Sequence, residues 1–204
     1  MSNILFTKKF IAKLTAIIRN FWWTGIREET NFKILCLRAW KDICSPKSEG
    51  GLGIRNLQAM NQGLILMAAW RIADQPNEFL HRVLKSKYFP DSSIWRQNAN
   101  APKSAFWASI IKILPILKAH SFYQISQGQI SIWSTPWCQN WAQIYDFLII
   151  QPNNYSYPAQ VKDLWIQNQQ NWNHQLLDTL FQPPMCAIIK NTPIICSQDE
   201  DFLC

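Results

Sequence analysis

The sequence lacks several features that define common classes of protein. Its six cysteines are widely spaced, none with Cys-x-x-Cys spacing, and no histidine is placed to complete a zinc site. No run of roughly 18 residues is both uncharged and predominantly apolar, as a membrane span requires. Lys8, Lys9 and Lys13 interrupt the first apolar stretch, which therefore does not resemble a secretory signal. An intracellular protein with reduced, buried thiols is therefore expected.

Glycine is also scarce, and its one cluster does not make a phosphate loop. Of six glycines, three lie in Gly50-Gly51-Leu52-Gly53. A phosphate loop needs Lys-Ser or Lys-Thr after its last glycine, but Ile54-Arg55 follow here. The cluster instead predicts a tight turn with positive-φ residues.

Groups that could carry catalysis are few and scattered. His81, His120 and His174 lie far apart, each without a neighbouring acid or a matched nucleophile, and surface histidine is the expectation for each. The run Asp199-Glu200-Asp201 has two interpretations, a solvated acidic run near a terminus or a divalent-metal site, and the first is favoured. No Asp-Asp pair is present, and the first acid is Glu28. The sequence therefore predicts no catalytic residues, no metal site and no cofactor.

Positive charge, apolar residues and tryptophan are abundant. Hydrophobic residues make up 48% of the chain, which has eleven tryptophans and a net charge of +7. Residues 1–118 contain 18 Lys/Arg and 7 Asp/Glu, whereas residues 119–204 contain 2 and 6. A basic first half suits a surface that faces phosphates, because each neutralised phosphate releases counterions. A merely soluble basic protein is the alternative.

Hydrophobic periodicity predicts a mainly α fold. Asn56 and Ser104 are expected to cap helices, and Gly25 to stop the first one. A β-hairpin around Gln127-Gly128 is expected to pair the two segments that flank it. Charge and periodicity both change near Ala119, which predicts two domains, 1–118 and 119–204. The expected helices cover Phe6–Phe21, Lys33–Ile43, Leu57–Ala73, Asn77–Tyr88, Ala105–Leu117, Val161–Trp165 and Asn173–Phe181.

Buried positions are also predicted for these helices. Leu35, Leu37, Trp40 and Ile43 are expected to be buried, and the helix between Gly63 and Ile72 to be central because it is apolar almost all round. The expected inward-facing residues of the fourth helix are Phe79, Leu80, Val83 and Leu84.

Basic residues near tryptophan are the feature of the sequence that most favours a specific function. On the first helix they lie outside its apolar stripe, and a second cluster lies on the fourth helix. Such residues would track a nucleic-acid backbone, with stacking on tryptophan as a supplement. Solvated helix faces, with Trp22 or Trp23 in the core, are the alternative. The candidate residues are Lys8, Lys9, Lys13, Arg19, Trp23, Arg27, Arg82, Lys85 and Lys87.

Taken in order, these landmarks resemble the segment after the reverse-transcriptase palm in plant LINE-type (non-LTR) retrotransposon polyproteins. The most specific part is the block from Trp40 to Leu57. In the hairpin, such proteins commonly have a Gly-x-Gly turn before Ile-Trp, whereas this chain has Ser126-Gln127-Gly128. The other matching stretches are Phe21–Gly25, Lys33, Asn61, Trp70-Arg71, Lys87–Phe89, Trp107 and Ile132–Trp137.

The resemblance implies a non-catalytic fragment. The polymerase aspartates of such proteins lie upstream and a zinc-binding module lies downstream, so Met1 would be an internal methionine or the start of a decayed copy. Residues 1–118 would be a helical thumb-like or linker lobe that grips the template–primer duplex. Residues 119–204 would be a small lobe with one β-hairpin and short helices, truncated before the zinc-binding module.

The expected partners are an RNA or DNA backbone and the polyprotein's own palm and zinc-binding modules, without a membrane. The expected site of action is the nucleus. A purely structural segment that docks on the palm and zinc-binding modules is the alternative. An enzyme in its own right is the third hypothesis.

Overall fold

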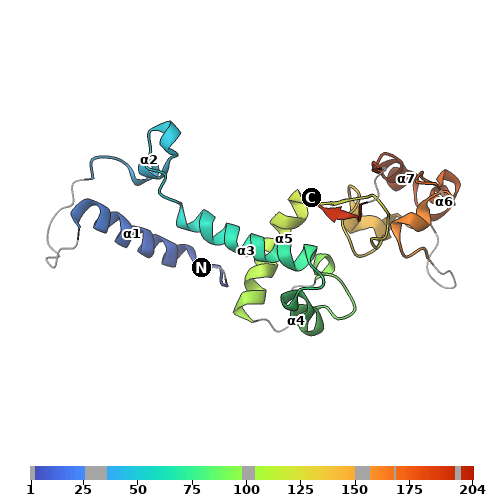
Figure 1. The fold of residues 1–204 in the computed structure, drawn as a ribbon, viewed down its shortest axis with the longest axis horizontal. Coiled ribbons are helices and arrows are strands. Elements are labelled where there is room, and N and C mark those ends of the chain that lie inside the picture. Colours follow the sequence, from blue (N-terminus) through green and yellow to red (C-terminus); the bar gives the residue numbers. More distant parts are fainter. Residues whose placement is uncertain (1–2, 26–35, 98–103, 150–156, 168, 196–198) are drawn as a thin grey trace. The chain divides into compact units, whose positions relative to one another are not determined.

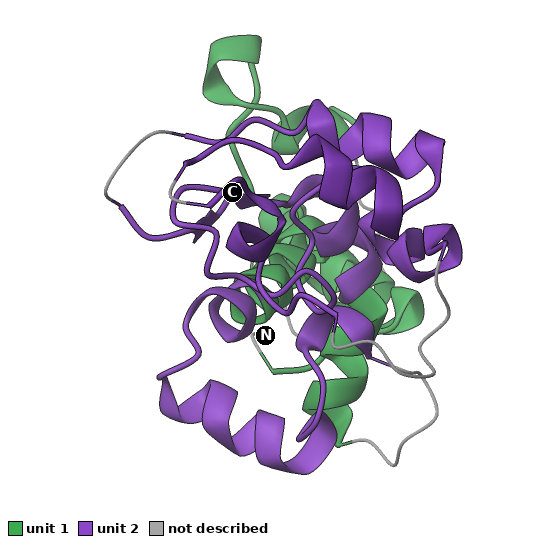
Figure 2. Ribbon diagram, turned by 90° about the vertical axis from the view of Figure 1, so that its right-hand side faces the viewer, with its two compact units in different colours: residues 1–69, 102–113 green, residues 70–101, 114–204 purple. Residues whose placement is uncertain are grey.

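The computed structural model describes residues 3–25, 36–97, 104–149, 157–167, 169–195 and 199–204. The described chain forms two compact units, coloured separately in Figure 2. Unit 1 comprises residues 1–69 and 102–113, and unit 2 comprises residues 70–101 and 114–204. Two helices, α3 and α5, each contribute to both units. The predicted division into domains 1–118 and 119–204 stays a prediction.

Unit 1 is helical. Its buried side chains include Ile65 and Ala69 from α3 and Trp107 and Ile110 from α5. In α1 only Ile11 is buried. Figure 1 labels the helices, which are α1 (Lys8–Thr24), α2 (Trp40–Cys44), η1 (Lys47–Glu49), and the unit's parts of α3 (Leu57–Asp74) and α5 (Ala105–His120).

Two polar side chains tie the segment before α1 into unit 1. Asn61 is buried; its Oδ1 accepts a hydrogen bond from the backbone N–H of Phe6, and its Nδ2 donates to the carbonyl of Ile4, both at 2.9 Å. The Ser109 hydroxyl accepts from the N–H of Leu5 at 2.9 Å. Because these bonds satisfy backbone groups that have no ladder partner, they fix where α1 begins.

The predicted helix ends are confirmed. Asn56 Oδ1 accepts from the N–H groups of Gln58 and Ala59 at the start of α3. The Ser104 hydroxyl accepts from the N–H of Trp107, and Gly25 ends α1 with φ +67°. Each cap satisfies backbone groups that a helix end leaves unpaired. α5 continues through Pro115 to His120, without the break that the proline could have produced.

The glycine cluster forms the predicted tight turn. Gly50 and Gly53 have φ values of +79° and +68°, which side chains with a Cβ rarely adopt. Gly51 is required for a different reason, since a Cβ there would lie 2.0 Å from the carbonyl oxygen of Ser45. The turn closes with a hydrogen bond from the N–H of Leu52 to the carbonyl of Ile43. The backbone conformation of this turn therefore requires glycine at all three positions.

Unit 2 combines short helices with one small antiparallel strand pair. Its elements include the ends of α3 and α5, both within the ranges given above. The others are α4 (Phe79–Tyr88), η2 (Ile94–Arg96), β1 (Tyr123–Gln124), η3 (Trp141–Phe147), η4 (Val161–Leu164), α6 (His174–Leu180), α7 (Pro183–Lys190) and β2 (Phe202–Leu203).

Tryptophan holds much of unit 2 together. The indole N–H groups of Trp137 and Trp141 both donate to the carbonyl of Ile132 at 3.0 Å. The Trp172 N–H donates to the carbonyl of Thr192, and its ring lies 5.8 Å from that of Trp137. A buried tryptophan with a satisfied N–H contributes a large apolar area. These tryptophans are therefore structural.

The mainly α fold with one small antiparallel strand pair is confirmed, but the pairing differs from the predicted hairpin. β1 pairs with β2, with Tyr123 opposite Leu203 and Gln124 opposite Phe202. The segment expected to pair with β1 instead bonds to residues 159–161: the N–H of Ile132 donates to Ala159 and the N–H of Val161 to Ile130. Local turn residues predict a hairpin, whereas long-range contacts select the partner.

Several predicted burial positions are wrong. Leu37 is 74% exposed, Phe79 80% and Met67 62%. The second predicted helix is confined to Trp40–Cys44, with Ile43 buried; Leu35 lies outside the described residues. The prolines after α6 begin α7 at Pro183, a position that proline favours in a helix. In the described part of the chain, no helix combines the length and the apolarity needed to cross a bilayer.

Candidate nucleic-acid interface

α1 presents four exposed cations and no acid. Lys8, Lys9, Lys13 and Arg19 are all exposed, and the 17 residues of α1 include no aspartate or glutamate. No salt bridge within the described residues involves any of the four. Their charge therefore faces solvent, as a surface that collects phosphates by counterion release requires.

The tryptophans at the end of α1 differ in exposure. Trp23, the predicted stacking residue, is half-buried, and its indole N–H is buried without a hydrogen-bond partner among the described residues. Trp22 is 48% exposed. Trp22 therefore offers more ring surface for stacking than Trp23 does. Arg27 lies outside the described residues.

The opposite face of α1 is apolar and largely uncovered. Phe10 is 48% exposed, Ile17 64% and Phe21 57%. At about 100° per residue these three side chains project from one face, which adjoins Lys13 and points away from Lys8, Lys9 and Arg19. An uncovered stripe of this kind marks a contact surface more often than a monomer surface.

The second predicted cluster lies on α4, in unit 2. Arg82, Lys85 and Lys87 are exposed, and the ammonium of Lys87 lies 5.3 Å from the centre of the Tyr88 ring. Lys85 and Lys87 occupy the last turn of α4, where cations also interact favourably with the helix dipole. Because α4 and α1 belong to different units, each cluster is a separate candidate surface.

His81, on the same helix, is not a surface residue. Its Nδ1 lies 2.5 Å from the carbonyl of Ile72, and its ring packs edge-on against Phe89 with centroids 5.6 Å apart. The expectation of a surface histidine holds for His120 and His174, which are exposed, and is wrong for His81, which is half-buried. Packing of α4 against the end of α3 accounts for the difference.

Arg96 is a half-buried cation that was not among the residues predicted from the sequence. Its Nε donates to the carbonyl of Trp133 at 2.9 Å, and its Nη1 donates to the carbonyl of Ala142 at 2.8 Å. Its guanidinium lies 4.1 Å above the Trp141 ring, close enough for a cation–π interaction. Burial lowers the pKa of Arg96, and the nearby Tyr145 and Asp146 partly offset this. The sequence feature that could have indicated this cation is the Trp95-Arg96 pair, which lies within a polar loop.

Asp201 is the second residue that was missed. Its Oδ1 accepts from the N–H groups of Ser126 (2.6 Å) and Gly128 (2.9 Å), and its Oδ2 from Gln129 (2.6 Å) and Ile130 (3.2 Å). Four N–H groups thus converge on one carboxylate, an arrangement that stabilises negative charge. The acid therefore anchors the 126–130 loop rather than forming part of a solvated run.

Gly128 makes this loop possible. Its φ is +65°, and a Cβ at this position would lie 2.8 Å from the backbone nitrogen of Lys162 and 2.8 Å from the Trp165 ring. Ser126, at the position where the resembling proteins commonly have glycine, is fully buried, and its hydroxyl has no hydrogen-bond partner among the described residues. In the described ranges, this loop included, no three His, Cys, Asp or Glu side chains lie close enough together to hold a metal ion.

Sequence comparison gives the family. The chain is 32% identical over 139 residues to the "Uncharacterized mitochondrial protein AtMg00310" of Arabidopsis thaliana, in an alignment that covers 67% of this chain and 88% of that protein. This chain belongs to that protein's family. No family model and no solved structure matches the chain.

A longer relative carries an enzyme name. The chain is 29% identical over 188 residues to the Arabidopsis thaliana protein named "Putative ribonuclease H protein At1g65750", covering 87% of this chain. The chain spans 28% of the length of that protein. Both relatives are plant proteins, which agrees with the plant resemblance drawn from the Trp40–Leu57 block.

Proposed function

We propose that this chain is a non-catalytic segment of a plant LINE-type retrotransposon polyprotein that binds nucleic acid without sequence preference. The resemblance of the Trp40–Leu57 block supports a position after the polymerase palm and before a zinc-binding module. The longer relative with ribonuclease H in its name, of which the chain spans 28%, supports a segment of a larger retroelement protein. Its proposed site of action is the nucleus.

The observation that carries this proposal is the acid-free, exposed basic face of α1. Lys8, Lys9, Lys13 and Arg19 project into solvent without carboxylate neighbours on their own helix. Such a face meets phosphate oxygens through long, mobile side chains and does not read base edges. Sequence-independent affinity is the chemistry that it supports.

Salt dependence tests the proposal. With roughly six phosphates neutralised, filter binding of a generic RNA–DNA duplex should weaken about a thousandfold between 50 and 200 mM salt. Changing Lys8, Lys9, Lys13 and Arg19 together to glutamine should abolish most of this retention. The matched control changes four exposed basic residues elsewhere in unit 1 to glutamine, namely Arg38, Lys41, Lys47 and Arg55. Absence of retention by the unaltered chain at the lowest salt would overturn the proposal.

The second candidate function is a docking segment that packs on the palm and zinc-binding modules of its polyprotein. The apolar stripe of α1, with Ile17 64% exposed and Phe21 57% exposed, favours it. An isolated chain with this stripe uncovered should associate with itself. A monodisperse monomer in light scattering would count against this function.

A further inference from the structure

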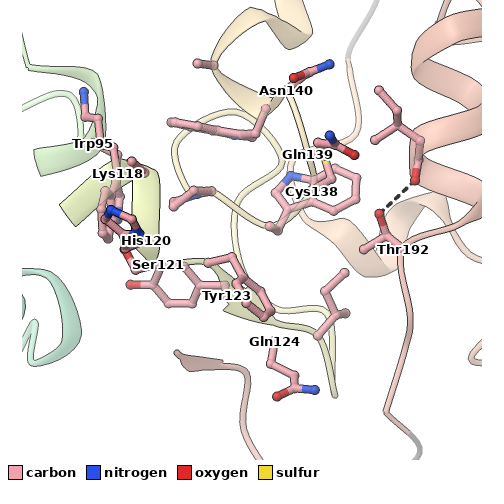
Figure 3. A pocket seen from close by; sticks show the side chains of 18 of the residues that line it. Trp95, Lys118, His120, Ser121, Tyr123, Gln124, Cys138, Gln139, Asn140 and Thr192 are labelled. Carbon is pink, nitrogen blue, oxygen red and sulfur yellow. Dashed lines mark hydrogen bonds between the residues drawn. The ribbon is translucent and has the colours of Figure 1, made fainter. Parts of the chain in front are cut away.

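Unit 2 contains a cavity of about 1080 Å³ that the proposed function does not use. Its walls come from the end of η2, the end of α5, β1 and the segments 136–142 and 187–193. Figure 3 shows side chains from these separate segments around one space. Ligand sites typically enclose about 300–1,000 Å³, so this cavity is large enough for a ligand of nucleotide size.

The charged residues that line the cavity are the cations Arg96 and Lys118, and His120 adds an imidazole. No aspartate or glutamate is among the lining residues. Lys118 and His120 are exposed on the last turn of α5, and Figure 3 shows them close together on one side of the cavity. Because no carboxylate lines the cavity, the positive charge of Lys118 is available to an anion, and the ring of His120 offers a hydrogen-bond group beside it.

The two cations repel one another. Partial desolvation lowers the pKa of Lys118, and the charge of Arg96 lowers it further. The hydrogen bonds of the Arg96 guanidinium to Trp133 and Ala142 go to neutral carbonyl groups, and the nearby Asp146, which is not among the residues that line the cavity, offsets its charge only in part. An anion bound beside both cations would relieve their repulsion, because each would gain an opposite charge.

The remaining walls suit a flat polar ring. Phe122 is 54% exposed at the cavity, and Tyr123 lies next to it. The carboxamides of Gln139 and Asn140 are exposed, and Figure 3 shows both beside Cys138 at the cavity wall. Aromatic faces stack on bases, and carboxamides donate to and accept from base edges.

The lining does not favour covalent chemistry. Burial raises the pKa of the Cys138 thiol to about 12. A thiol with so high a pKa stays protonated near neutral pH and is a poor nucleophile. The chemistry of the lining therefore suits binding rather than catalysis.

We propose that this cavity binds a phosphate-bearing nucleotide, with its phosphate at Arg96, Lys118 and His120 and its base against Phe122 and the carboxamides of Gln139 and Asn140. The nucleotide can be free or the phosphorylated end of a strand, since both present the same chemistry. This site shares no residue with the basic face of α1, so each can fail without the other.

Equilibrium dialysis of the full chain with labelled AMP and labelled adenosine tests the site. AMP should bind at least roughly tenfold more tightly than adenosine, because only AMP engages the cations. Equal retention of the two ligands, or retention of neither, would overturn the proposal.

Oligonucleotides with a 5′-phosphate and with a 5′-hydroxyl distinguish a free nucleotide from the phosphorylated end of a strand. Competition with AMP by the phosphorylated oligonucleotide alone assigns a strand end, and competition by neither assigns the free nucleotide.

Variants locate the site. Lys118→Gln combined with His120→Gln should weaken AMP binding at least roughly tenfold, and unchanged binding would overturn the assignment. Lys162→Gln removes an exposed lysine of the same unit outside the cavity and should leave binding unaltered. Circular dichroism verifies that each variant keeps the helical content of the parent. The variant without the four α1 cations should lose duplex retention and still bind AMP, which separates this site from the proposed function.

Discussion

At the scale of single residues, unit 2 depends on side chains that bind backbone groups. Asp201 accepts four N–H groups of the 126–130 loop, and Arg96 donates to carbonyl groups of the segments around Trp133 and Ala142. Each satisfies backbone groups that have no sheet partner at these points. The irregular part of the chain is therefore held by two charged residues of opposite sign.

Asp201→Asn should destabilise unit 2 by about 3 kcal/mol, because an asparagine NH₂ would face two of the four N–H donors and leave them without an acceptor. Urea unfolding followed by circular dichroism measures the change. Glu200→Gln removes the same charge from the neighbouring exposed acid and should change stability by about 0.5 kcal/mol or less. Equal stabilities of the two variants would contradict the anchoring role.

Cys138 provides a prediction that depends on pH. Burial raises the pKa of its thiol from 9.0 to about 12, so the folded state favours the neutral thiol. That contribution to stability is complete below pH 9 and declines as pH rises toward 12. At pH 8, iodoacetamide should alkylate Cys138 roughly a hundredfold more slowly in the folded chain than in urea. Mass spectrometry measures both rates, with exposed Cys204 as the internal control. Similar rates for Cys138 in the two states would contradict its burial.

At the scale of elements, α1 separates two kinds of surface along one helix. Its cations occupy one face and its exposed apolar side chains another, while Ile11 is its only buried residue. A helix with so little of its apolar face covered gains little stability from packing. Its apolar face can therefore be altered with little effect on the fold.

Ile17→Gln combined with Phe21→Gln should reduce self-association while leaving thermal stability nearly unchanged, since both side chains are more than half exposed. Size-exclusion chromatography with light scattering measures the mass. Met67→Gln combined with Leu37→Gln makes the same chemical change at exposed sites outside α1 and should leave the mass unaltered. If both pairs change association equally, the α1 stripe has no special role.

At the scale of the whole molecule, the proposed role is binding without catalysis. Two-metal nucleotidyl transfer needs carboxylates that converge on a metal pair, and the sequence has no Asp-Asp pair and no acid before Glu28. The purified chain should therefore incorporate no nucleotide on a primed template with Mg²⁺ or Mn²⁺. Template-dependent extension above a control without protein would contradict the proposed function and revive the hypothesis of an enzyme.

The two basic clusters were predictable from the sequence, whereas the two charged anchors were not. Lys8, Lys13 and Arg82 are exposed because lysine and arginine on the polar side of an amphipathic helix rarely have anywhere else to lie. Asp201 looked like one member of a solvated acidic run. Its role depends on the approach of a loop more than seventy positions earlier in the chain, and no local pattern encodes that approach.

By itself, the sequence determined what local chemistry decides: the helix caps at Asn56 and Ser104, the stop at Gly25 and the turn at the glycine cluster. Only the tertiary structure decided which strand pairs with Tyr123–Gln124, how Arg96 is held, and which apolar side chains stay exposed. Caps and turns satisfy backbone groups within a few residues, so their partners are adjacent in sequence. Strand partners, buried cations and covered faces depend on residues that meet only after the chain has folded, and periodicity does not identify those residues.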